Sequence, residues 1–149
     1  MAILRDVPYG NQHFRVDLGT GSDGPDAGFS HIVLPDISID VIEYRAGNDK
    51  ESGVHKLPGL AHYGNVILRR GIIGSLNLYD WINQVRNGDA NARRTVTISL
   101  LSEDLTNVVL TWKLLRAWPV KYAFGDLNAK GTDVAIEELV LAYERLEME

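Results

Sequence analysis

The stretch RTVTISLLSEDLTNVVLTWKLLRA, residues 94–117, decides the fold class of this 149-residue chain. In its first part, Val96 and Ile98 alternate with small polar residues, and β-branched residues dominate. Such residues favour the pleated backbone of a strand. A polar segment over 102–107 then separates this strand from an apolar run over 108–117. The pattern predicts a β-hairpin.

Three further strand candidates precede the hairpin, over residues 12–18, 29–44 and 65–70. The first alternates apolar with polar residues, which implies one buried face. Pro35 interrupts the second. Because proline cannot donate a hydrogen bond to a neighbouring strand, we expect a bend, a bulge or an edge position there.

The chain after the hairpin predicts one long final strand, over residues 132–147. Before it, Trp118-Pro119 breaks the strand pattern, and residues 124–131 have the composition of a loop. The apolar residues of the final strand change parity near Glu137-Glu138. This change indicates a bulge, or a strand that packs against one surface with its first part and against another with its second part.

One helix is predicted, over residues 75–86. Ser75 or Asn77 can cap its start, and Gly88 can take the left-handed conformation that ends it. The apolar residues recur at i, i+3, i+4 and i+7, so they share one face that we expect to lie against a sheet. They are Leu78, Trp81, Ile82 and Val85.

Together these elements predict a single domain over residues 1–149, mostly β within the α+β class. Six or seven strands form a β-barrel or two packed β-sheets, with one flanking α-helix and a long extended loop. A chain of this length suits one domain with a real core.

The composition excludes several classes of function. The formal net charge is -5, whereas general nucleic-acid binding needs a basic surface. The chain has no cysteine, which excludes disulfides, cysteine-zinc sites and thiol catalysis. Its first residues show no signal-peptide pattern, and no stretch approaches the ~18 uninterrupted apolar residues of a membrane helix. We therefore expect synthesis in the cytoplasm and no stable membrane insertion by the chain alone.

No motif for catalysis or for a cofactor is convincing. Gly19, Gly21 and Gly24 formally match G-x-G-x-x-G, but no helix follows them, so we interpret the segment as a hairpin-type loop. The four histidines lack the spacing of a zinc site, and there is no nucleophile-elbow motif. We predict no catalytic residue, no metal and no cofactor.

The most unusual feature is a long polar loop over residues 45–61, without strand or helix periodicity. Loops of this length in compact domains tend to be functional. It combines charges of both signs, which give partner specificity, with a small apolar anchor. We predict that a contact between subunits is formed by Tyr44, Arg45, Asp49, Lys50, Glu51, Lys56, Leu57, Pro58 and Leu60. The alternative is a flexible surface loop that only connects two strands.

Six segments follow one another along most of the chain: VIEYRAGND (41–49), KLPGLAHYGNVILRRG (56–71), LYDWINQV (78–85), TVTISLLSED (95–104), WKLLRAWPVKY (112–122) and VAIEELVLAYERLE (134–147). Together and in this order they resemble the tail tube family of contractile phages and extracellular contractile injection systems. The segment FSHIVLPDISID (29–40) departs from the family, with a proline where a glycine-containing kink is usual. This departure leaves open whether the chain is the major tube subunit or a minor paralogue nearer the baseplate.

The resemblance implies a fold similar to that of the tube protein of type VI secretion, with two β-sheets and a flanking helix. It implies a structural protein and not an enzyme: a homo-hexamer whose rings stack into an inner tube around a lumen that conducts DNA or protein effectors. The implied partners are a contractile sheath protein, the baseplate and tube-terminating proteins, in a virion tail or an injection particle. The alternative functions are a soluble effector or adaptor carried by such a particle, and a free ligand-binding β-barrel.

Two sets of charged residues have two interpretations each. Arg69-Arg70 and Arg93-Arg94 are either solvated strand ends or ion-pairing partners of a neighbouring subunit. The acidic residues of the last predicted strand form either a solvated sheet face or part of an acidic channel or of charged contacts between rings. They are Glu137, Glu138, Glu144, Glu147 and Glu149.

Overall fold

The computed structural model describes residues 2–19, 28–48, 50 and 52–149. The elements along these residues are β1 (Phe14–Asp17), β2 (His31–Val33), β3 (Ile37–Tyr44), β4 (His55–Tyr63), β5 (Val66–Gly71), α1 (Asn77–Arg86), the 3-10 helix η2 (Ala90–Ala92), β6 (Arg94–Leu101), β7 (Val108–Phe124), β8 (Ile136–Ala142) and β9 (Arg145–Met148). The fold is therefore mostly β with one α-helix among the described residues, as the sequence predicts.

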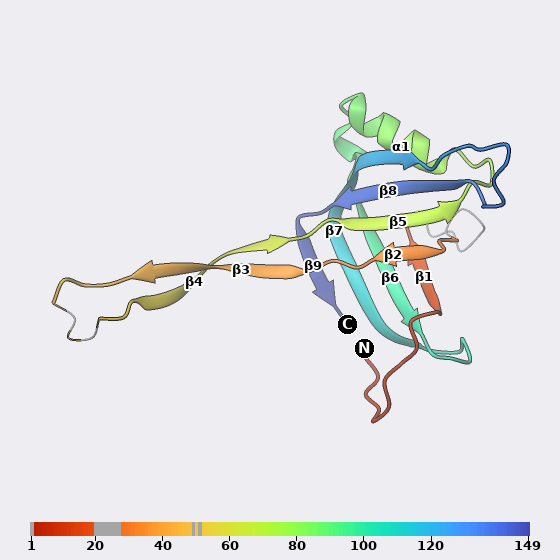
Figure 1. Ribbon diagram of the computed structural model, residues 1–149. Helices are drawn as coiled ribbons and strands as arrows, with labels where there is room; N and C mark the ends of the chain where they lie inside the picture. Colours follow the sequence, from red (N-terminus) through yellow and green to blue (C-terminus); the bar gives the residue numbers. More distant parts are fainter. Residues whose placement is uncertain (1, 20–27, 49, 51) are drawn as a thin grey trace.

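Seven strands form one sheet with the order β1-β6-β7-β8-β5-β2, and β9 also pairs with β7. The long strand β7 belongs to two halves of this sheet (Figure 1). Its first part pairs with β6 and β9, and its last part, from Trp118, pairs with β8. Between them the register with β6 shifts by one residue, and Arg116 has a φ of 55°. Such a bulge bends a strand, so the two halves of the sheet can pack against each other.

One core joins the two halves of the sheet. Leu68 of β5, Ile98 of β6 and Leu139 of β8 are buried in the same apolar cluster. In the described part of the chain, the end strands β1 and β2 pair only with β6 and β5. The strands of one subunit therefore form packed sheets, and the β-barrel that the sequence also allowed is wrong for the single chain.

Helix α1 packs on this body through Leu78 and Trp81, as predicted. The indole Nε1 of Trp81 donates a hydrogen bond to the carbonyl oxygen of Ala92 at 2.7 Å, so its polar atom is satisfied inside the core. Gly88 follows the helix with a φ of 80°, which confirms its role in ending it. The predicted cap is wrong, because Leu76 occupies the N-cap position and no side chain caps the helix there.

The predicted loop over 45–61 is wrong in its second half, since residues 55–63 form β4. Strands β3 and β4 pair as a separate two-stranded sheet that projects from the body (Figure 1). We call these two strands the arm.

The arm begins after Pro35, where the sequence predicts an interruption. There the N–H of Gly64 donates to the carbonyl oxygen of Asp36 at 3.2 Å. A Cβ on Gly64 would lie 2.1 Å from Oδ1 of Asp36, so a larger residue here would require the exposed Asp36 side chain to move.

Two other strand boundaries also differ from prediction. Strand β7 continues through Pro119, because the proline lies at a second register shift, where no ladder hydrogen bond from its nitrogen is needed. The final strand is divided into β8 and β9 at Tyr143 and Glu144. No register shift occurs at Glu137-Glu138, since β8 pairs regularly with β5 from Ile136 to Leu141. The predicted change of packing surface lies instead at the break between β8, which pairs with β5 and the last part of β7, and β9, which pairs with the first part of β7.

Candidate subunit interface

The arm exposes apolar side chains on both of its faces. Directly opposite residues of an antiparallel pair point to the same side, and neighbours along a strand point to opposite sides. One face therefore carries three apolar pairs nearest the body, Ile37 with Tyr63, Ile39 with Ala61 and Val41 with Pro58. The other face carries its apolar pair, Ile42 with Leu57, farther out, followed by Tyr44 opposite His55. Every residue of β3 is exposed.

A bulge in β4 changes which residues of this strand lie on each face of the arm. Ile39 faces Ala61 and Val41 faces Pro58, so β4 contains one residue more than β3 between these pairs. A Cβ on Gly59, within the bulge, would lie 3.1 Å from Cβ of Asp40. On the face that carries Ile42 and Leu57, Nε2 of His62 and Oδ2 of Asp40 lie 2.8 Å apart. The base of this face is therefore polar, and its apolar surface begins only beyond Asp40.

Most of the predicted contact residues lie in the outer half of the arm. Tyr44, Lys56, Leu57 and Pro58 occupy paired strand positions, and Leu60 lies beside the bulge with 73% of its surface exposed. Arg45 and Lys50 lie in the connection between the strands. Asp49 and Glu51 lie outside the described residues, as do Gly21 and Gly24 of the glycine-rich segment. Sequence reasoning missed the inner apolar pairs, although the alternation of Ile37, Ile39 and Val41 signals them.

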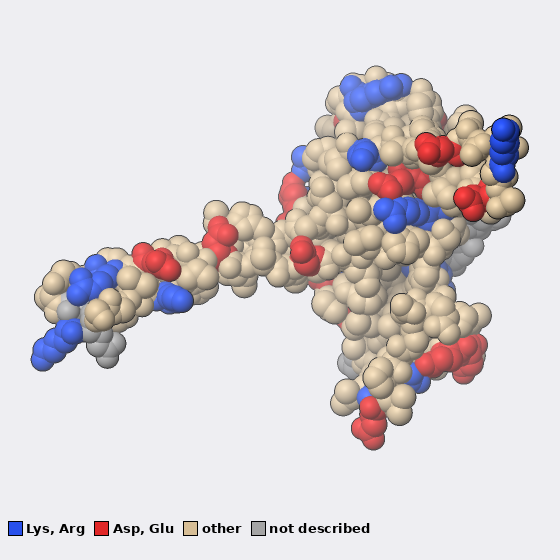
Figure 2. All heavy atoms as spheres, in the orientation of Figure 1, with Lys and Arg blue, Asp and Glu red and all other residues tan. Residues whose placement is uncertain are grey.

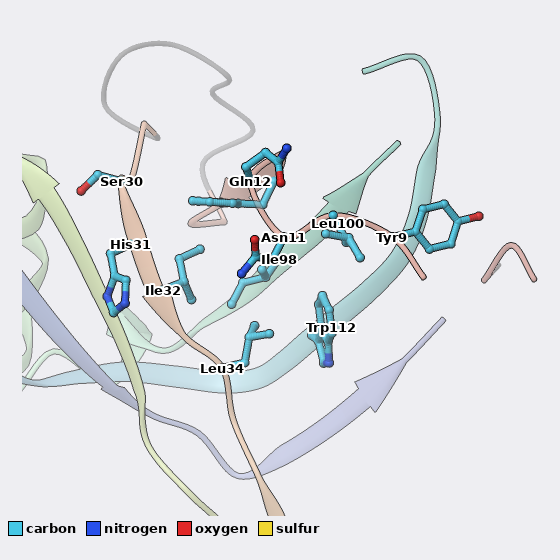
Figure 3. A pocket seen from close by; sticks show the side chains of 12 residues that line it. Tyr9, Asn11, Gln12, Ser30, His31, Ile32, Leu34, Ile98, Leu100 and Trp112 are labelled. Atoms are coloured by element: carbon cyan, nitrogen blue, oxygen red, sulfur yellow. The ribbon is translucent and has the colours of Figure 1, made fainter. Parts of the chain in front are cut away.

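The body carries a hollow of about 500 Å³ between β1 and β2 (Figure 3). Figure 3 shows Ile32 and Leu34 on one side of it, with Leu100 and Trp112 on the other. Residues 9–12 and Ser30-His31 contribute polar groups around it. Sequence reasoning did not predict the hollow, because β1 and β2 follow each other along the chain but pair with different strands, β6 and β5.

The N-terminal segment beside this hollow is held by an ion pair and by a hydrogen bond from the N–H of Ile3 to the carbonyl oxygen of Val109 at 2.9 Å. The guanidinium of Arg5 donates two hydrogen bonds to the carboxylate of Glu103, at 2.5 and 3.0 Å, and further ones to the carbonyl oxygens of Val7 and Pro8. These bonds lower the pKa of Glu103 to about 2. The pKa of Asp104, in the same turn, is also lowered to about 2, by hydrogen bonds from Ser102 and Thr106. The turn between β6 and β7 is therefore anionic at neutral pH.

The arginine pairs find partners within the subunit, and Arg70 is no solvated strand end. Arg70 is buried and bonds to Glu137 of β8, while Arg69 donates to Glu138 at 2.8 Å. Arg93 and Arg116 both pair with Glu144 at the break between β8 and β9. Arg94 is half-buried with its guanidinium 4.7 Å from the ring centre of Trp81. Glu137, Glu138 and Glu144 therefore hold the fold, whatever else they do.

Within the described ranges, no group of three or more His, Asp or Glu side chains is placed to hold a metal ion. The same residues include no helix of the length and apolar character that crossing a membrane requires.

Comparisons with known proteins give a consistent result. The family model described as "T4-like virus tail tube protein gp19" matches residues 10–147. No curated protein matches the sequence significantly. Among solved structures, a chain of the sheath–tube complex of the extracellular contractile injection system PVC, in the extended state, is 30% identical. The match covers 95% of this chain and 91% of that one, with a TM-score of 0.82.

A chain from the PVC sheath/tube terminator complex is 31% identical, with coverage of 97% and 98% and a TM-score of 0.83. Hcp1 from Flavobacterium johnsoniae is more distant, with 15% identity, coverage of 91% and 93% and a TM-score of 0.55. At that identity the likeness concerns the fold alone.

Proposed function

This chain belongs to the T4-like virus tail tube protein family, and from this premise we propose that it is a structural subunit of the inner tube of a contractile injection particle. Subunits form hexameric rings, and the rings stack around a lumen that conducts DNA or protein cargo. The protein acts by assembly and not by catalysis, and it needs neither a metal nor an organic cofactor.

The exposed apolar arm is the observation that carries this proposal. An isolated two-stranded hairpin is marginally stable at best in water, and contiguous exposed apolar surface marks an interaction site. Both faces of the arm are apolar over part of their length, and the strands project from the core. A subunit that functioned alone would gain nothing from this surface. In a ring or a stack of rings, the same surface is covered by neighbouring copies.

The unpaired edges of the sheet support the same conclusion. Among the described residues, β1 and β2 end the strand order, and an open edge invites pairing with another chain. Pairing each edge with the next subunit around a six-fold axis removes these edges and joins the inner sheets into one continuous barrel. The closed barrel is thus a property of the ring.

The partners in this proposal are a contractile sheath, a baseplate and a tube-terminating protein. The PVC chains to which this one is similar come from sheath–tube and terminator complexes. Their identities to this chain, 30% and 31%, are nearly equal. A minor tube subunit near one end of the tube is therefore the second candidate. Its copy number per particle, low compared with that of a main tube subunit, would distinguish it.

Electron microscopy and native mass spectrometry of the purified protein test the proposal. We expect six-membered rings or tubes, and masses at multiples of six subunits, as the concentration rises. A protein that stays monomeric over a wide concentration range, with and without its sheath partner, would contradict the tube function. It would favour a soluble effector or adaptor.

A further inference from the structure

Only one asparagine in the sequence directly precedes a glycine, and this pair, Asn87-Gly88, lies at the end of α1. In such a pair the backbone nitrogen of the glycine can attack the side-chain carbonyl carbon of the asparagine. Glycine favours the attack because it has no Cβ to obstruct it and tolerates most backbone conformations. Both residues are exposed, and a Cβ on Gly88 would meet no atom within 4 Å. The surrounding chain therefore leaves room for this reaction.

The side chain of Asn87 is free to react. Asn87 occupies the C-cap position of α1, and its backbone N–H donates to the carbonyl oxygen of Asn83 at 3.1 Å. Its carboxamide makes no hydrogen bond to another described residue. No hydrogen bond within the described chain therefore fixes the group that would be attacked.

The end of the helix slows this reaction without preventing it. The N–H of Gly88 donates to the carbonyl oxygen of Val85 at 3.1 Å, and Asn87 has a ψ of 3°. Closing a five-membered ring between the two residues needs a different ψ and breaks that hydrogen bond, so the last turn of the helix must open first. Helix ends fray at little cost in free energy, and α1 lies on the outside of the body (Figure 1).

We propose that Asn87 is a site of spontaneous deamidation, with water as the only co-reactant. The nitrogen of Gly88 loses its proton and forms a bond to Cγ of Asn87. The bond between Cγ and Nδ2 breaks, and ammonia leaves with that proton. Water then opens the resulting succinimide ring at either carbonyl carbon, which gives aspartate or isoaspartate. Neither step involves oxidation or reduction.

Both products change the junction between α1 and η2. A carboxylate at the C-terminal end of a helix meets the partial negative charge of the free carbonyl oxygens there, which is unfavourable. Figure 2 shows basic side chains over α1, so the new charge also alters the electrostatic character of this surface. Isoaspartate adds one carbon atom to the main chain and so displaces the N–H of Asp89 from the carbonyl oxygen of Gln84, which it now bonds at 3.1 Å. This loosens the connection to Ala92, which accepts the hydrogen bond of Trp81.

Peptide mapping by mass spectrometry tests the proposal on the purified full-length chain, incubated for weeks at a mildly alkaline pH. Asn91 is the internal control, because it is exposed in the same segment but is followed by Ala92. We expect Asn87 to lose its carboxamide about five-fold faster than Asn91 or more, because Ala92 has a Cβ and Gly88 has none. Chromatography of the modified peptide should separate an aspartate and an isoaspartate form. The rate should rise with pH, because the deprotonated nitrogen is the attacking group.

A denatured sample and the variant Asn87→Gln complete the experiment. The longer glutamine side chain closes a ring far more slowly, so the variant should keep its carboxamide and its initial thermal stability. On incubation the melting temperature of the wild type should fall more than that of Asn87→Gln. Equal rates at Asn87 and Asn91 would overturn the proposal, as would an intact Asn87 in the native chain when the denatured chain is converted. Equal falls in melting temperature would overturn the loosening of the junction.

Discussion

Arg70 of β5 and Glu137 of β8 face each other across the sheet, form an ion pair, and are only 1% and 3% exposed. The pair is part of a larger network. The hydroxyl of Tyr122 donates to the second carboxylate oxygen of Glu137 at 2.5 Å, and Arg70 also donates to Oδ1 of Asn77 at 2.6 Å. Because Asn77 begins α1, the network fixes the start of the helix to the sheet.

We expect Arg70→Met to destabilise the subunit by about 3–5 kcal/mol, the usual cost of leaving one buried charge without its partner. The double variant Arg70→Met with Glu137→Leu should recover most of this loss, because an apolar pair of similar volume is often no worse than a buried ion pair. Denaturant unfolding of the three proteins measures both differences. A loss below about 1 kcal/mol in the single variant would show that Glu137 finds other compensation.

Tyr122 and Tyr143 should respond oppositely to the loss of their hydroxyl groups. The pKa of each is raised to about 12, first by burial. The hydroxyl of Tyr122 donates to buried Glu137, so Tyr122→Phe should cost about 1.5–3 kcal/mol, as for hydrogen bonds to charged groups.

The hydroxyl of Tyr143 is buried and has no hydrogen-bond partner among the described residues, so Tyr143→Phe should be neutral or stabilising. Chemical denaturation of both variants makes this comparison, with each as the other's control. Equal losses in the two would contradict it.

Trp81 anchors α1, and Trp81→Ala should cost about 3–5 kcal/mol, the range for truncating a buried large aromatic. The substitution removes the side chain from the core and also its hydrogen bond to Ala92. Thermal and denaturant unfolding measure the loss. Tyr79→Ala, on the exposed side of the same helix, controls for a general effect on the helix and should cost far less. Unchanged stability of Trp81→Ala would show that the helix does not pack as described.

The last predicted strand shows why its packing was misread from the sequence. The buried face of β8 carries Glu137, Leu139 and Leu141 at alternate positions, so its periodicity is regular. In the sequence, a glutamate at a buried position is interpreted as facing solvent. With Glu137 counted as exposed, the apolar residues before and after it fall on opposite faces of the predicted strand. Its partners Arg70, 67 positions away, and Tyr122 make the burial of Glu137 tolerable. The spacing of apolar residues within one strand carries no information about such a contact between distant residues.

The arm was predicted as a site of contact but not as a pair of strands. Pro58 and Gly59 disfavour a strand on composition, and neither side of β4 is buried in a way that gives clear alternation. The bulge at Gly59 shifts the phase further. The hairpin over 94–117 was predictable because its strands β6 and β7 each bury one face in the core.

The N-terminal segment should lose its ion-pair contact with the turn between β6 and β7 at low pH. Folding lowers the pKa of Glu103 to about 2, so its pairing with Arg5 stabilises the segment above the unfolded pKa of about 4.3. This stabilisation is lost as the pH falls from there toward 2. We expect the NMR amide signals of residues 3–10 to stay unchanged from pH 7 to 5 and to shift below pH 4.

Glu103→Gln is the control for this pH effect, and it should show the shifted signals already at pH 7. A wild-type segment that is released between pH 7 and 5 would contradict the assignment to Glu103.

Deleting residues 48–53 should leave the subunit folded but abolish long tubes. The deleted segment lies in the sequence between Tyr44, the last residue of β3, and His55, the first residue of β4, and the core residues lie in the body. Circular dichroism and thermal stability should therefore match the wild type. Assembly should fail, because the deletion shortens the arm and displaces Tyr44 and Lys56 from the contact proposed for them. Each ring repeats this contact in every copy, so a small loss per subunit is multiplied along the tube.

The matched control for this deletion removes six residues elsewhere, 126–131, from the exposed connection between β7 and β8. That connection takes no part in the proposed contact, so this variant should assemble. Negative-stain images of both variants, at the concentration at which the wild type forms tubes, give the comparison. If the variant lacking 48–53 forms tubes of normal length and stability, the end of the arm is not the joint. The contact between subunits must then lie on the sheet surfaces or at the termini.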